Sequence, residues 1–101
     1  MLSINIDFEL AYRQADEMSR CADELFIQHK NLEMSIAELC SIWTGGVSAT
    51  FVEKLEASAS LLYADAVKCR DEAAAFRMKV DEIKLAEESA THAMSCSAEA
   101  S

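Results

Sequence analysis

The stretch SIWTGGVSAT, residues 41–50, decides the fold, because Gly45 and Gly46 are the only glycines in a chain that has no proline. Glycine and proline are the residues that most often interrupt regular secondary structure. On both sides of this pair the sequence is rich in Ala, Leu, Glu, Met and Lys, which favour helix. The sequence therefore predicts an all-α fold, with helices over about 7–43 and 47–86 and a turn at 43–46.

Apolar residues recur at alternating steps of four and three along both predicted helices, which is a heptad pattern. In the first helix the series is Ile4, Phe8, Ala11, Ala15, Met18, Ala22, Leu25, His29, Leu32, Ile36, Leu39 and Trp43. In the second helix it is Val52, Leu55, Ala59, Leu62, Ala66, Cys69, Ala73, Phe76, Val80 and Ile83. Because a short connection makes the helices antiparallel neighbours, we expect these two seams to face each other in a helical hairpin.

Apolar residues outside the seams predict a further partner. They are Tyr12, Phe26, Ile27, Met34, Phe51, Leu61, Tyr63, Val67 and Met78. Extended apolar patches usually mark a partner surface, so we expect a second hairpin to complete a four-helix bundle dimer. His29 is the polar member of the first seam, and we expect a bundle histidine there, able to set register or partner choice, in preference to a metal ligand. Asp16 and Arg20 are spaced for an ion pair across one helical turn.

Charge and composition exclude several classes of function. The net charge is −9 and the basic residues are not clustered, which argues against nucleic-acid binding. No apolar run approaches the roughly 20 residues of a membrane-spanning helix, so stable membrane insertion is not expected. The first seven residues do not resemble a cleavable signal peptide. Residues 87–101 are mostly small and polar and have lost the heptad pattern, so a flexible tail is expected there.

The sequence offers no convincing catalytic, cofactor-binding or metal-binding residues. The cysteines at 21, 40, 69 and 96 have spacings unlike those of zinc sites or compact disulfide frameworks. Folding about the turn brings Cys21 near Cys69, and both a disulfide and two free thiols remain open. With two histidines and no evident nucleophile–base pair, we expect a protein that is not an enzyme.

The turn itself carries a recognisable motif, Trp43-Thr44-Gly45, followed by an aromatic residue at Phe51. This arrangement resembles the WxG-motif family of small secreted proteins of type VII secretion systems, in its motif, its length near one hundred residues and its central turn. The resemblance implies that Trp43, Gly45 and Phe51 belong to a secretion and turn motif. It implies export of a folded dimer, without a cleavable signal peptide, from the cytoplasm by a type VII secretion ATPase. In that family the Trp-x-Gly turn lies near the end of the partner's second helix.

The chain departs from that family in its second motif. Family members carry Tyr-x-x-x-Asp/Glu after the second helix, whereas no tyrosine follows Tyr63 here. Tyr12 and Asp16 have this spacing but lie in the first helix. The departure suggests that a partner supplies the missing element, as in the family's heterodimers. The dimer partner itself is left open between a second copy, a sister hairpin protein and a secreted toxin. The alternatives are a targeting partner for the helical N-terminal domain of a larger toxin and a generic cytoplasmic coiled-coil adaptor.

Overall fold

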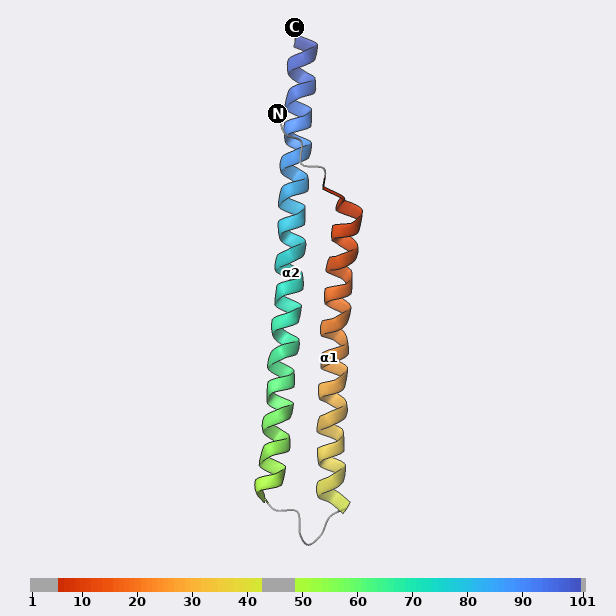
Figure 1. Ribbon diagram of the computed structural model, residues 1–101, viewed down its shortest axis with the longest axis vertical. Coiled ribbons are helices and arrows are strands. Elements are labelled where there is room, and N and C mark those ends of the chain that lie inside the picture. Colours follow the sequence, from red (N-terminus) through yellow and green to blue (C-terminus); the bar gives the residue numbers. More distant parts are fainter. Residues whose placement is uncertain (1–5, 43–48, 101) are drawn as a thin grey trace.

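The computed structural model describes residues 6–42 and 49–100, which form an all-α helical hairpin (Figure 1). Helix α1 spans Phe8–Ile42 and helix α2 spans Ala49–Ala100. The two helices run side by side in opposite directions, and the molecule measures 86 × 17 × 17 Å. No strand occurs within these ranges. The expected turn at 43–46, with Trp43 and Gly45, lies outside the described residues.

Helix α1 begins where Asp7 caps it. The Leu10 amide donates a hydrogen bond of 3.0 Å to the Asp7 side-chain Oδ1, and the Ala11 amide donates one of 3.0 Å to the Asp7 carbonyl oxygen. A side chain that accepts from an otherwise unpaired amide of the first turn stabilises a helix end by about 1 kcal/mol. This cap explains why the helix starts at Phe8.

The prediction that regular structure ends near residue 86 is wrong, because α2 continues to Ala100. Alanine, the strongest helix former, recurs through residues 86–100, and neither glycine nor proline occurs there. Intrinsic helix propensity thus continues the helix after the heptad pattern has stopped. As a result α2 is 52 residues long against 35 for α1, and it extends past the N-terminus of α1 (Figure 1).

The centre of the hairpin is made of small side chains. The most deeply buried residues are Ala15 and Ala22 on α1 and Ala59, Ala66 and Ala73 on α2, each 2% exposed or less. On each helix they recur every seven residues, so they line one continuous strip. Small side chains at a contact allow helix axes to approach to about 8 Å, the short end of the usual range. The larger side chains at the flanking heptad positions, such as Leu25 and Leu62, lie to the sides of this strip and are only half-buried.

The predicted seam residues therefore occupy different depths. Ile36 and Val80 continue the alanine strip and are buried. The remaining described members are half-buried, and among the predicted site residues these are Phe8, Met18, Leu25, His29, Leu32, Leu39, Leu55, Leu62, Cys69 and Phe76. Ile83 differs, because its residue is 44% exposed. It lies near the level at which α1 begins, so little of α1 is left to cover it.

Candidate functional site

The hairpin has two long sides of different chemistry. We call one side the polar edge, formed by Tyr12, Asp16, Phe26, Tyr63, Arg70, Arg77 and Asp81. We call the other side the apolar edge, formed by Met18, Leu25, Leu32, Leu39, Leu55, Leu62, Cys69 and Phe76. Both edges draw residues from both helices at heptad spacing, and the buried alanines separate them.

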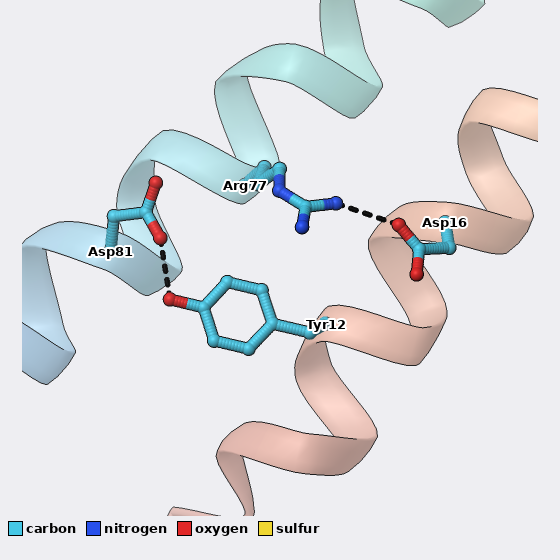
Figure 2. A network of polar contacts seen from close by, with 4 residues as sticks. All are labelled: Tyr12, Asp16, Arg77 and Asp81. Carbon is cyan, nitrogen blue, oxygen red and sulfur yellow. Dashed lines mark hydrogen bonds and ion pairs between the residues drawn. The ribbon is translucent and has the colours of Figure 1, made fainter.

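At the open end of the hairpin, where α1 begins, two contacts along the polar edge join the helices (Figure 2). The Tyr12 hydroxyl donates a hydrogen bond of 2.5 Å to Asp81, and the Arg77 guanidinium lies 2.6 Å from the Asp16 carboxylate. The hydrogen bond to Asp81, with smaller contributions from desolvation and the Asp81 charge, raises the pKa of the Tyr12 phenol. Arg77 and Lys84 also stand over the Tyr12 ring, 5.3 and 5.5 Å from its centre. These contacts join α1 to α2 in one defined register.

Aromatic residues continue the polar edge toward the turn. The Phe26 and Tyr63 rings meet edge to face, with centres 5.6 Å apart, and the Arg70 guanidinium lies 5.6 Å from the Phe26 ring centre. The His29 ring lies 5.1 Å from the Tyr63 ring, and its Nε2 is 3.6 Å from the Glu33 carboxylate. The predicted bundle histidine is thus half-buried between the helices, with contacts to Tyr63 and Glu33.

The apolar edge is open to solvent. At the end of this edge nearer the start of α1 lies a shallow groove whose lining includes Met18 and Cys21 from α1 and Cys69 and Phe76 from α2. Leu25, Leu32 and Leu39 follow Met18 at heptad steps, and Leu55 and Leu62 precede Cys69 in the same way. The half-buried side chains of this edge therefore form one apolar strip along the hairpin, and no other part of the chain in residues 6–42 and 49–100 packs against its outer surface.

The α1 residues immediately beside the apolar edge form an uncharged inner border, and Glu17, Glu24 and Glu38 lie outside it. Gln14 and Cys21 line the groove, and the same heptad position continues with Gln28, Ser35 and Ile42. A solvent-facing flank of a helical seam is usually occupied by charged residues, often Glu or Lys. Five uncharged residues at heptad spacing beside an apolar strip are instead typical of a surface that another helix covers.

The structure also places residues whose role the sequence did not predict. The expected Asp16–Arg20 ion pair is wrong, because Asp16 pairs with Arg77 on α2. The only signal for the polar edge in the sequence is the heptad recurrence of Tyr63, Arg70, Arg77 and Lys84, four residues after the buried alanines and Val80. That spacing shows which side chains share an edge, but pairing them with α1 needs the register of the hairpin.

Within the described part of the chain, Cys21, Cys40 and Cys69 carry free thiols, and no group of three or more His, Cys, Asp or Glu side chains could hold a metal ion. No helix there is long and apolar enough to cross a membrane. Phe51, at the start of α2, is 48% exposed. No family model, curated protein or solved structure matches this chain.

Proposed function

We propose that this protein is a binding module whose apolar edge is covered by another helical protein chain. The observation that carries the proposal is the depth of the core. In the described residues the most deeply buried side chains are alanines, whereas Leu25, Leu62 and Phe76 are only half-buried. Stable domains bury apolar surface between packed layers of secondary structure. A lone pair of helices forms a single thin layer, so it buries only a narrow strip of apolar surface. A partner helix or hairpin on the apolar edge would supply the missing layer.

We propose that the module works without catalysis. Catalytic groups need a pocket that excludes water and converges several polar side chains on one point. The groove of the apolar edge is shallow, and much of its lining is apolar, with Met18, Cys69 and Phe76 among its residues. Such a surface suits the side chains of a neighbouring helix better than a small substrate.

The test places a photo-crosslinking amino acid in the full chain at Gln28 or, as the matched control, at Ile27. These neighbours project about 100° apart on α1. Gln28 borders the apolar edge, whereas Ile27 is 59% exposed elsewhere on the helix. In the native cells, position 28 is expected to yield one main protein adduct, identified by mass, and position 27 is expected to yield little. Equal adducts from both positions, or none from position 28, would overturn the proposal.

The turn motif supports a more specific proposal, that the module is exported by a type VII secretion system together with its partner. Its support is the sequence Trp43-Thr44-Gly45 at the only glycine pair of the chain, with Phe51 eight residues after the tryptophan. The chain lacks the family's second motif after the second helix, so the partner would provide it. That partner would be a sister hairpin or the helical domain of a secreted toxin, because a second copy of this chain lacks the same motif.

Export is tested by comparing wild type with Trp43→Ala in the culture supernatant and in the cell pellet of the native organism. The account predicts that the variant stays in the cells while its binding to the partner is retained. Normal export of Trp43→Ala would reject a signal at the turn. Absence of the wild-type protein from the supernatant would favour the cytoplasmic adaptor.

A further inference from the structure

We infer that the chain covering the apolar edge is a second copy of this protein, oriented so that both turns lie at the same end of a four-helix bundle. The inference rests on the proposed binding module and adds the identity and the orientation of its partner; the export motif that both copies lack would then come from another chain. Four exposed charged residues carry it, namely Glu24 and Glu38 on α1 and Lys54 and Lys68 on α2.

The register of the hairpin shows which residues stand at the same height. In the contacts Tyr12–Asp81 and Asp16–Arg77, the two residue numbers add to 93. Antiparallel helices advance equally, about 1.5 Å per residue, so the relation continues along the hairpin. Glu24 is therefore level with Lys68, since 24 and 68 add to 92. By the same relation Glu38 is level with Lys54.

These charges lie on the outer borders of the apolar edge. Glu17 lines the groove, and Glu24 and Glu38 occupy its heptad position farther along α1. On α2, Lys68 lies one turn before Glu72, another groove residue, and Lys54 is two heptads earlier. The two borders are on opposite sides of the strip, too far apart to meet within one hairpin. In the residues that the structure describes, none of the four forms an ion pair.

A second copy brings the two borders together. If the two hairpins are related by a two-fold axis parallel to their helices, α1 of each copy packs antiparallel against α2 of the other. This operation keeps every residue at its original height. Glu24 then faces Lys68 of the second copy, and Glu38 faces its Lys54, and symmetry repeats each pair. Opposite charges at the flanks of a helical seam set partner choice and orientation.

The same orientation also pairs exposed apolar residues near the turn. Ile42 is 72% exposed and Phe51 is 48% exposed, and their numbers again add to 93. In this dimer Ile42 of one copy lies level with Phe51 of the other, on the borders that meet. Both side chains would lose contact with water in the same interface.

Turns at opposite ends would give a less favourable dimer. That arrangement packs α1 against α1, so the outer border with Glu17, Glu24 and Glu38 meets an identical acidic border. Like charges at such positions are destabilising. The opposite-end arrangement is the one implied by the WxG resemblance, so measuring the orientation distinguishes the two.

The first experiment measures the mass and the orientation of the full chain. A spin label is attached to Cys40, which is exposed and lies near the end of α1. The other three cysteines are removed by the substitutions Cys21→Ser, Cys69→Ala and Cys96→Ser. Sedimentation equilibrium is expected to give twice the 11.1 kDa chain mass. Pulsed dipolar spectroscopy is expected to give a label separation below about 35 Å, since a four-helix bundle is about 20–25 Å across. A separation of about 50 Å or more, the length of α1, overturns the orientation.

A monomer that nevertheless forms the position-28 adduct with a different protein overturns this inference and leaves the proposed function standing. A monomer without that adduct contradicts both.

The second experiment reverses the charges. Lys68→Glu is expected to weaken dimerisation about three- to tenfold, because two symmetry-related surface pairs are lost. Adding Glu24→Lys to it is expected to restore affinity to within about twofold of wild type. The matched control is Arg20→Glu, which changes the net charge equally on the α1 face that carries Ile27 and Met34. Equal weakening by the control, or no recovery in the double variant, overturns the pairing.

Discussion

Tyr12, in the second turn of α1, donates its phenolic hydrogen bond to Asp81, which lies 69 residues later in the chain. Two heptads farther from the start of α1, aromatic contacts replace the polar ones, and Phe26 meets Tyr63. The alanine strip alone would allow the helices to slide, since its members are nearly alike. The polar edge therefore defines the register of the hairpin, and the proposed partner would cover the apolar edge.

The Asp16–Arg77 ion pair is expected to add only a little to the free energy of unfolding, because both side chains are exposed to solvent. The side chains are 58% and 50% exposed, and exposed ion pairs are worth about 0.2–1 kcal/mol. A double-mutant cycle with Asp16→Asn and Arg77→Met is expected to give a coupling free energy in this range by urea unfolding. Salt should reduce the coupling. A coupling of zero at low salt would show that the two side chains do not interact in solution.

The Tyr12 phenol is expected to titrate above its usual pKa of about 10, because Asp81 accepts its proton in a hydrogen bond. Since the folded-state pKa is raised, the stability from this bond is fully present below the unfolded pKa and is lost as pH rises through the folded pKa. In a Tyr63→Phe background Tyr12 is the only tyrosine, and its ultraviolet absorbance can be titrated alone. Asp81→Asn should lower that pKa. An unchanged titration would refute the contact.

The close approach of the helices makes the alanine strip intolerant of larger side chains. Ala66 is fully buried, and Ala66→Leu is expected to destabilise the hairpin by about 1–3 kcal/mol through overpacking. Ala64→Leu adds the same volume at an exposed position of α2 and should change stability by less than about 0.5 kcal/mol. Urea unfolding at one fixed protein concentration compares them. Similar effects from both variants would mean that the helices are not closely packed at Ala66.

The extension of α2 beyond α1 is expected to be the least protected part of the helices. Residues 93–100 lie past the level of Phe8, and isolated helical ends have little stability without packing. Their amides should exchange with solvent much faster than those around Ala66 in hydrogen-exchange measurements on the full chain. Protection as strong as at Ala66 would contradict this, and would show that something covers the extension.

The two-helix architecture was predictable because its signals are local. One glycine pair, the absence of proline and the heptad recurrence are enough to place α1 and the start of α2 to within two residues. The end of α2 was predicted too early because the heptad pattern reports only where one helix packs against another, and that pattern stops near residue 86. Residues 86–100 are helical on the strength of their alanine-rich composition, which does not need that pattern.

The division into two edges was not predictable from a list of seam residues. The sequence marks Ala66 and Leu62 equally as seam positions, yet one is fully buried and the other half-buried. Which one is central depends on how near the helices approach and on their rotation, and both are decided by contacts between residues far apart in sequence. Asp16 illustrates this, because Arg13 and Arg20 lie about one turn from it along the helix but its partner is Arg77.

The most direct test of the account compares two natural thiols. Cys21 borders the apolar edge and Cys40 does not, and both are exposed in the isolated hairpin. The full chain would be alkylated in its native cells, and the two rates normalised to those of the urea-unfolded protein. If a partner covers the apolar edge, Cys21 is modified several times more slowly than Cys40. Equal normalised rates would show that the edge is bare in the cell and would contradict the central claim.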